Sequence, residues 1–181
     1  SMFTRMQDGT PEDWAVIGAA HKEHFYKTPA HLMDMLRSLK NITAGFACDQ
    51  LQHSLMTGTL ARRDDAADEE VAIALLHDVG KSVNIPNHGP IAAELLRPYV
   101  SDDAYHVIYN HQHFQGKFYY TFMGENPNMR DDFTQKSWYD LAVKLVDRWD
   151  APAFDPDFEA DSLDSFEPLL QKIFSQPGRV L

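Results

Sequence analysis

The sequence has little cysteine, little positive charge and no long apolar run, and each lack narrows the class of protein. A single cysteine, Cys48, excludes an internal disulfide and fits a reducing cytoplasm, where we expect the protein to act. No apolar run approaches the length of a membrane-spanning helix, and no signal peptide is expected at the start. Only 16 Lys and Arg stand against 27 Asp and Glu, and the net charge of -11 argues against a nucleic-acid surface.

Helical periodicity dominates the remaining sequence and predicts an all-α protein. Pro, Gly and short acidic capping segments separate the apolar stretches and mark where helices begin and end. The expected helices cover about residues 28–40, 49–63, 68–76, 88–96, 101–111, 137–150 and 165–174. Residues 114–136 are aromatic, contain Gly and Pro, and lack periodicity, so they predict a long loop.

Nine histidines are unusual in a chain of this length, and several of them lie inside or at the ends of expected helices. Together with two aspartates they form a candidate set of metal ligands, which are His53, His77, Asp78, His88, His111 and Asp150. Imidazole and carboxylate groups are the ligands that iron, manganese and zinc prefer. One metal ion needs three or four such ligands, so six are enough for two ions. Asp78 has two oxygens and can bridge cations that lie about 3.5–4 Å apart.

Taken singly, these residues have ordinary explanations. A lone histidine such as His53 is more often a hydrogen-bonded core residue, and Asp150 can cap a neighbouring helix. The pair His77-Asp78 is different, because it follows the apolar run of "ALLHDVGK". A buried carboxylate without partners is costly, so this pair needs a cation or several donors. Since separate helices each contribute a ligand type, we favour a metal site.

The order His, His-Asp, His, His, Asp resembles the HD-domain superfamily, and "HDVGK" is the most specific match. The resemblance covers roughly residues 45–175 and implies an HD-domain helical bundle around a binuclear metal site. Carried over by position, one metal would be held by His53, His77, Asp78 and Asp150. The other would be held by Asp78, His88 and His111. Asp78 would then touch both metals.

Chain length predicts a single domain over residues 1–181. Within it, residues 45–175 are expected to form the metal-binding core. Residues 1–27 are expected to form an N-terminal extension or a lid helix.

The superfamily includes phosphohydrolases and a smaller branch of mixed-valent di-iron oxygenases, namely myo-inositol oxygenase and the bacterial organophosphonate oxygenases. The stretch from "LQHS" to "HDVGK", the segment "RWDAPAF" and the closing "FEPLLQKIF" resemble the oxygenases more. This implies two iron ions (Fe²⁺/Fe³⁺) that use O₂ to oxidise a small polar substrate, such as a hydroxylated phosphonate or a polyol. The alternative is a binuclear phosphohydrolase that acts on a nucleotide or another phosphoester with Mn²⁺, Mg²⁺, Ni²⁺ or Zn²⁺.

Further polar residues are candidates for the substrate site. Lys81 follows Asp78 by about one helical turn, and its charge suits an anionic or polyhydroxylated substrate, so we expect both residues to take part in catalysis. Lys117 is expected to hold a phosphonate or phosphate oxygen. His113 is expected to contact the substrate or to form a hydrogen bond with one of the metal-ligating residues. Asp147 lies three residues before Asp150 and is its rival as the last ligand; the resemblance to the oxygenases favours Asp150.

The surroundings of the expected pocket show one departure from the oxygenase pattern. The phosphonate oxygenases carry a lid tyrosine and glutamate shortly before the first histidine, where this chain has Thr43 and Phe46. Aromatic residues after His111 are expected to roof the pocket and to exclude water, and these are Tyr119, Tyr120 and Phe122.

Overall fold

The computed structural model describes residues 2–181, and within them it contains eight α-helices and no strand. The helices are α1 (Pro11–Phe25), α2 (Thr28–Ser38), α3 (Gln50–Arg63), α4 (Asp68–Leu76), α5 (His88–Leu96), α6 (Asp102–Tyr119), α7 (Tyr139–Lys144) and α8 (Glu167–Phe174). Short 3₁₀ turns are η1 (Met6–Asp8), η2 (Val79–Ser82), η3 (Tyr120–Met123), η4 (Met129–Phe133) and η6 (Leu163–Phe166). A π-helix, η5 (Leu145–Asp150), follows α7. No helix of the described chain has the length and apolarity to cross a membrane. The expected all-helical fold is confirmed.

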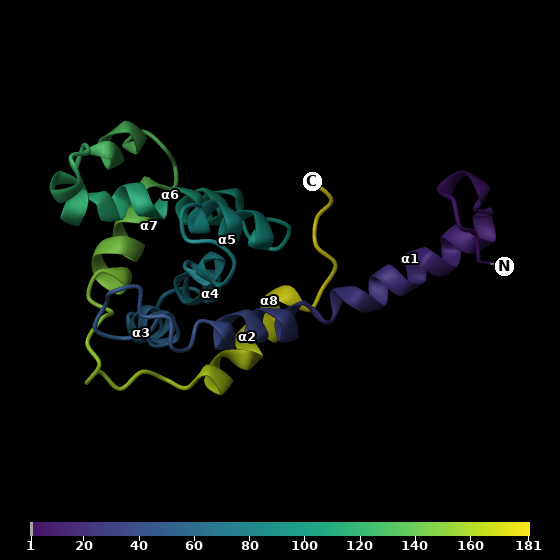
Figure 1. Ribbon diagram of the computed structural model, residues 1–181, viewed down its shortest axis with the longest axis horizontal. Helices are drawn as coiled ribbons and strands as arrows, with labels where there is room; N and C mark the ends of the chain where they lie inside the picture. Colours follow the sequence, from purple (N-terminus) through teal and green to yellow (C-terminus); the bar gives the residue numbers. More distant parts are fainter. Residues whose placement is uncertain (1) are drawn as a thin grey trace.

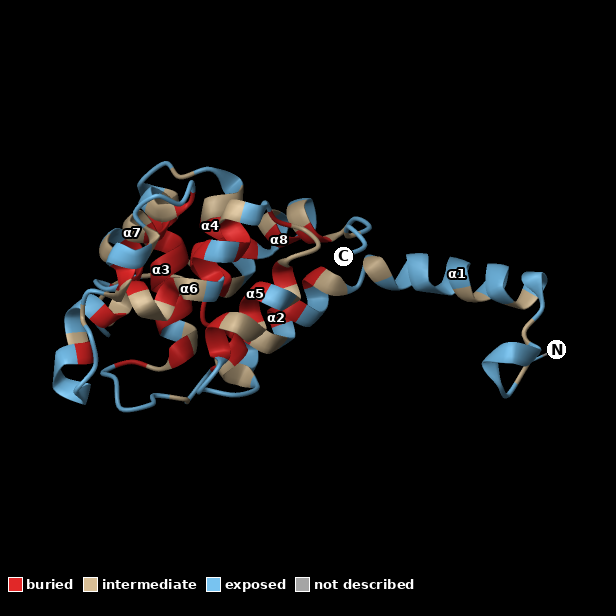
Figure 2. Cartoon of the chain, turned by 90° about the horizontal axis from the view of Figure 1, so that it is seen from above, coloured by how far each residue is buried: buried red, intermediate tan, exposed pale blue. Residues whose placement is uncertain are grey.

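Helix α4 forms the centre of the bundle (Figure 1). Its residues 71–76 are all apolar and all buried, so this part of the helix has no face for solvent. α3 and α6 pack against α4, α5 packs along α6, and α8 packs on α2 and α4. The buried residues concentrate in this body of the chain (Figure 2). Because α4 lies at the centre, its C-terminal end brings His77 and Asp78 to the interior of the bundle.

Helix α1 lies outside this bundle and projects away from it (Figures 1 and 2). It begins with a capping box, in which Thr10 and Asp13 each bond the other's backbone N–H, and Pro11 occupies the first turn. None of its residues is buried. That residues 1–27 form an N-terminal extension or a lid helix stays a prediction.

The loop expected over residues 114–136 is wrong over its first part, because α6 continues to Tyr119. The fully buried Phe114 explains the extension: its ring packs 5.9 Å from the rings of both Phe133 and Trp138. This aromatic cluster comes from segments that are distant in sequence, so helical periodicity does not reveal it. As a result His111 lies in the middle of a helix rather than at its end.

The helix expected over residues 137–150 is divided. α7 passes into the π-helix η5, where the N–H of Ala151 bonds the carbonyl of Val146 at 2.8 Å. In an α-helix two side chains three residues apart share one face. The wider π turn separates Asp147 from Asp150, and only Asp150 points toward the histidines. Such π segments occur often at functional sites.

Candidate metal centre

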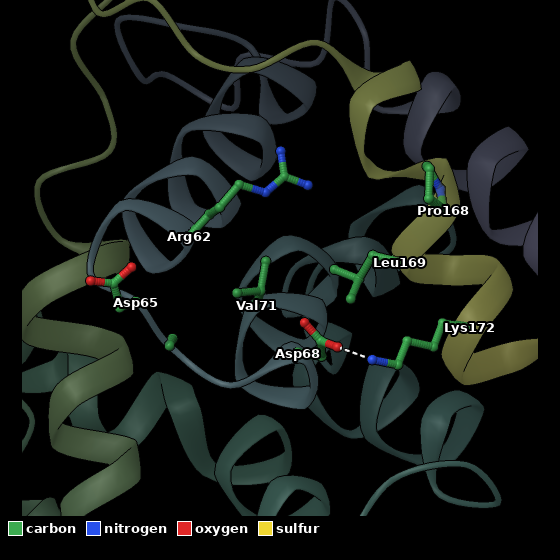
Figure 3. A pocket seen from close by; sticks show the side chains of 8 residues that line it. Arg62, Asp65, Asp68, Val71, Pro168, Leu169 and Lys172 are labelled. Atoms are coloured by element: carbon green, nitrogen blue, oxygen red, sulfur yellow. Dashed lines mark hydrogen bonds and ion pairs between the residues drawn. The ribbon is translucent and has the colours of Figure 1, made fainter.

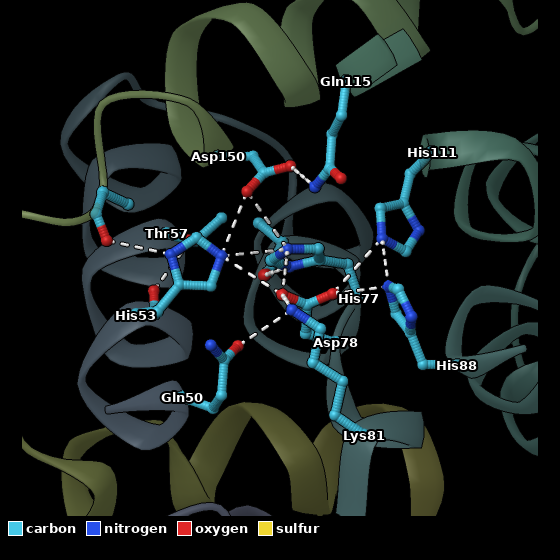
Figure 4. A network of polar contacts seen from close by, with 12 residues as sticks. Gln50, His53, Thr57, His77, Asp78, Lys81, His88, His111, Gln115 and Asp150 are labelled. Atoms are coloured by element: carbon cyan, nitrogen blue, oxygen red, sulfur yellow. Dashed lines mark hydrogen bonds and ion pairs between the residues drawn. The ribbon is translucent and has the colours of Figure 1, made fainter. Parts of the chain in front are cut away.

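Six polar side chains from different parts of the bundle meet in its interior (Figure 4). α3 supplies one histidine, the end of α4 a histidine and an aspartate, α5 and α6 one histidine each, and η5 an aspartate. They are His53, His77, Asp78, His88, His111 and Asp150, and none is more than 5% exposed. The structure therefore brings together all six residues that the sequence singled out as metal ligands.

The four histidines share one orientation. In each ring Nδ1 lies against a backbone carbonyl, at 2.9 Å for His53 and Ala153, 2.7 Å for His77 and Ala74, 2.8 Å for His88 and Ile85, and 2.7 Å for His111 and Ile108. A carbonyl oxygen only accepts hydrogen bonds, so each Nδ1 carries the proton. In the neutral ring Nε2 then holds a lone pair, and this is how a metal-binding histidine is usually oriented.

The four Nε2 atoms form two facing pairs. The distance is 3.3 Å between His53 and His77, and 3.2 Å between His88 and His111. Two lone pairs do not bond to each other, so each pair requires a proton or a metal cation. Asp78 lies between the pairs, with Oδ2 3.3 and 3.2 Å from the first pair and Oδ1 3.2 Å from each ring of the second. One carboxylate thus joins both halves of the cluster.

Asp150 completes the first half. Its Oδ1 lies 3.0 Å from Nε2 of His53 and 3.4 Å from Nε2 of His77. This oxygen is buried and accepts no hydrogen bond from the described chain. The other oxygen, Oδ2, accepts a hydrogen bond of 2.5 Å from Nε2 of Gln115. A buried anionic oxygen without a donor is costly, and a cation beside it would remove the cost.

The charges of the cluster hold a proton in the absence of metal. Burial lowers the pKa of His77, but the carboxylates of Asp78 and Asp150 outweigh burial and raise that pKa to about 10. Burial raises the pKa of Asp78, but His77 and Lys81 hold it well below its ordinary value. Burial is decisive for His111 and lowers its pKa, although Asp78 opposes the change. A metal ion in the first half would therefore displace a proton.

The donor set fits a transition metal. Two groups have ligand atoms that all lie within 4.8 Å of one another, namely His53, His77 and Asp150, and His77, Asp78 and His111. Imidazole with carboxylate is a set that iron, manganese, nickel and zinc accept. These buried groups can hold a metal ion, and the donor set does not by itself select which metal.

The structure places Lys81 beside this cluster. Its ammonium donates to Oδ2 of Asp78 at 3.1 Å and to Oε1 of Gln50 at 3.0 Å. Gln50 is fully buried, and neither Gln50 nor Gln115 is among the site residues expected from the sequence. Helical spacing offers a signal for both, because they lie three residues before His53 and four after His111 and so share their faces.

Three other candidates lie away from the cluster. Asp147 accepts two hydrogen bonds from the buried guanidinium of Arg130, at 3.0 and 2.9 Å. The ammonium of Lys117 lies 3.9 Å from Asp147, and its side chain is 56% exposed. Nδ1 of His113 lies 3.2 Å from the hydroxyl of Tyr120. None of these side chains lines the cavity beside the cluster.

A cavity of about 370 Å³ opens onto the cluster. Its polar lining consists of Asp78, Lys81, Gln115 and Asp150, and its apolar lining of Phe46, Phe118, Tyr119, Ala151 and Phe154. Tyr119 thus lines the cavity as expected, and burial raises its pKa to about 12. Tyr120 and Phe122 do not line it, and Phe122 is 89% exposed.

A second cavity, of about 400 Å³, lies between α3, α4 and α8 (Figure 3). Its two basic side chains are already paired: the ammonium of Lys172 lies 2.5 Å from Asp68, and Arg62 donates to Asp161 at 3.0 Å. No histidine lines this cavity, and within the described chain it has no contact with the cluster. Of these two cavities, only the first is lined by residues of the cluster.

Comparison with known families agrees with this geometry. Residues 51–153 match the family described as HD domain, and the match covers more than half of the chain and all six clustered residues. The chain belongs to the HD-domain family. No curated protein gives a significant match. HD-domain proteins are usually metal-dependent enzymes and often hydrolases, so membership indicates metal-dependent catalysis and leaves the reaction to be inferred.

Proposed function

We propose that this HD-domain protein is a di-iron oxygenase that uses O₂ to oxidise a small substrate bound in the cavity beside the cluster. In this proposal His53, His77, Asp78 and Asp150 would hold one iron. Asp78, His88 and His111 would hold the other. When bound, the iron pair would activate O₂, which is the oxidant and accepts the electrons that the substrate loses.

The position of Asp78 carries the proposal. It is the one carboxylate of the cluster whose two oxygens face different histidine pairs, at 3.2–3.3 Å from each ring. A site for two cations needs a bridging anion of this kind. Asp150 contacts only the first pair. The expected split of the ligands into two sets therefore has support in the contacts of one residue.

The residues around the cluster have separate tasks in this proposal. Gln115 donates to Asp150 and fixes the direction of that carboxylate. The backbone carbonyls that accept from each Nδ1 keep every Nε2 turned inward. Lys81 contacts Asp78 and also lines the cavity, so it orients an anionic or hydroxyl group of the substrate next to the metals.

Two features of the cavity favour oxidation over hydrolysis. Lys81 is its one cationic lining residue in the described chain, whereas transfer of a phosphoryl group is usually assisted by several cationic groups. Aromatic rings from Phe46, Phe118, Tyr119 and Phe154 form much of the wall. With a substrate bound against it, such a wall would keep water from a reactive intermediate, while a hydrolase must admit water.

The alternative is a binuclear phosphohydrolase that uses Mn²⁺, Mg²⁺, Ni²⁺ or Zn²⁺. Its support is family membership together with a donor set that accepts these ions as well. Both readings assign the same ligands, so replacement of a ligand does not separate them.

Metal identity and reaction separate the two. Protein purified without oxygen is analysed for metals, and O₂ consumption and hydrolysis of bis(p-nitrophenyl) phosphate are then measured on the same sample. The oxygenase predicts about two irons per chain and no hydrolysis. Protein that holds only manganese or nickel and cleaves the diester in the absence of O₂ would overturn the proposal.

A further inference from the structure

Part of the cavity wall is a fixed stack of aromatic rings. The ring of Phe154 lies 4.1 Å from the imidazole of His53 with an interplanar angle of 10°. Phe46 stacks on Phe154 in turn, with ring centroids 4.5 Å apart and an interplanar angle of 17°. Phe154 is thus held against a residue of the cluster, and Phe46 extends the apolar surface toward the cavity mouth.

The segment that presents Phe46 has an unusual backbone. Asn41, Ala44 and Gly45 have positive φ angles of 68°, 49° and 87°. The left-handed region is costly for a residue such as Ala44, and it persists where surrounding contacts enforce it. Here the side chain of Asp49 accepts from the N–H of Asn41 at 3.0 Å, and the N–H of Phe46 bonds a carbonyl within the same turn. Strained positions of this kind cluster at ligand-binding sites.

Two rings of the cavity lining remain open to solvent. Phe46 is 46% exposed and Phe118 is 49% exposed, although both line the cavity. Exposed aromatic surface around a concave site is where an apolar ligand gains the most on binding. Phe118 belongs to α6 and Phe46 to the segment before α3, so the two rings reach the cavity from separate parts of the fold.

The polar side of the cavity is small by comparison. Its charged lining residues are Asp78, Asp150 and Lys81, and the ammonium of Lys81 already contacts Asp78 and Gln50. A phosphonate dianion is usually held by several charged donors, and the ammonium of Lys117 lies beside Asp147 instead. A polyol needs many hydrogen-bonding partners, which an aromatic wall does not offer. A ligand with one acid group therefore matches the cavity, because Lys81 supplies its single ammonium.

We propose that the cavity binds a small monocarboxylate with a planar or branched apolar body, whose acid group faces Lys81 and whose body lies against Phe46 and Phe118. This rests on the proposed function in that it takes the same cavity as the substrate site, and it narrows the expected polar substrate to an amphiphilic one. The apolar body supplies binding energy, and the acid group sets the orientation relative to the cluster.

Binding of simple acids to the metal-loaded protein tests this by isothermal titration calorimetry. The probes are phenylacetate, acetate and methylphosphonate, none of which has to react. Phenylacetate should bind at least about tenfold more tightly than acetate, because its ring leaves water for the aromatic wall. Methylphosphonate should bind no better than acetate. Equal affinities for phenylacetate and acetate, or tighter binding of methylphosphonate than of phenylacetate, would overturn the inference.

Variants assign the preference to the wall. Phe46→Ala and Phe118→Ala should each weaken phenylacetate binding at least about fivefold and leave acetate binding unchanged. Phe122→Ala is the matched control, because this ring is 89% exposed and does not line the cavity. Phe46→Leu keeps an apolar side chain and should restore part of the affinity if Phe46→Ala disturbs the segment. Equal weakening of both acids by Phe46→Ala, with metal content preserved, would contradict the role of the ring.

The outcome is distinguishable from that of the proposed function. A protein that holds manganese and hydrolyses a diester, yet prefers phenylacetate tenfold, refutes the oxygenase and supports the amphiphilic cavity. A di-iron protein that consumes O₂ but binds methylphosphonate best supports the oxygenase and refutes the cavity inference.

Discussion

Replacing Asp78 by asparagine keeps the shape of the side chain but removes a negative charge from the point where the two histidine pairs meet. The wild-type oxygens lie 3.2–3.3 Å from all four Nε2 atoms, so a cation in either half contacts this carboxylate. Two unit charges about 4 Å apart interact by about 4 kcal/mol at an effective dielectric constant near 20. Because a dication carries twice that charge, each metal should lose at least about 4 kcal/mol, or roughly a thousandfold in affinity.

The assay is competition with a chromophoric chelator, followed by metal analysis of protein freed from excess metal. Asp78→Asn should hold less than about one metal in ten chains under conditions that load the wild type fully. Asp140→Asn is the control, because this aspartate is exposed at the start of α7 and lies outside the cluster. Retention of two metals by Asp78→Asn, with affinities within tenfold of the wild type, would refute the bridging role.

Three further predictions concern the two halves of the cluster. Asp150→Asn should remove one metal per chain and Asp147→Asn none, measured as metal content after identical reconstitution. Metal affinity should increase from about pH 6 to about pH 8, and calorimetry should detect released protons. The reason is that the neighbouring carboxylates outweigh burial and raise the pKa of His77 to about 10, so that a bound metal displaces a proton. A metal affinity that is independent of pH would contradict this. Gly80→Ala should lower metal content to about one per chain, since an added Cβ would lie 2.1 Å from the carbonyl oxygen of His88.

That these six side chains lie together was predictable from the sequence, because several of them carry a local signal. His77 and Asp78 are two polar residues that directly follow a wholly apolar helical run, and the other histidines lie in helices with clear periodicity. Four inward-turned Nε2 atoms follow from backbone carbonyls that the sequence does not display, so orientation required the structure. The all-helical fold was predictable for the same reason, since apolar spacing marks helices and their ends.

The extent of α6 and the course of residues 137–150 were not predictable from local pattern. Phe114 is buried by rings from distant segments, and this packing overrides the Gly and aromatic content that indicated a loop. In the π-helix, Asp147 forms a part-buried ion pair with Arg130, a residue 17 positions earlier. Contacts of this range leave no periodic signal in the sequence, and Asp147 and Asp150 therefore stood as rivals.

The substrate side was the least predictable part. Lys117 has the right charge for an anionic substrate, but the sequence does not show in which direction its side chain points. In the structure its ammonium lies near Asp147 instead of in the cavity. Phe46 appeared only as a departure from the lid pattern of the phosphonate oxygenases, and its stacking on Phe154 depends on how the strained segment after α2 folds. Residues on such segments gain their role from tertiary contacts.

The most direct test of the central claim is metal analysis with EPR on protein that is handled without oxygen and then partly reduced. A binuclear iron centre bridged by Asp78 predicts about two irons per chain and the spin-one-half signal of a mixed-valent pair, and the signal should be absent from Asp78→Asn. One metal per chain, or two metals with the signal intact in Asp78→Asn, would contradict the account.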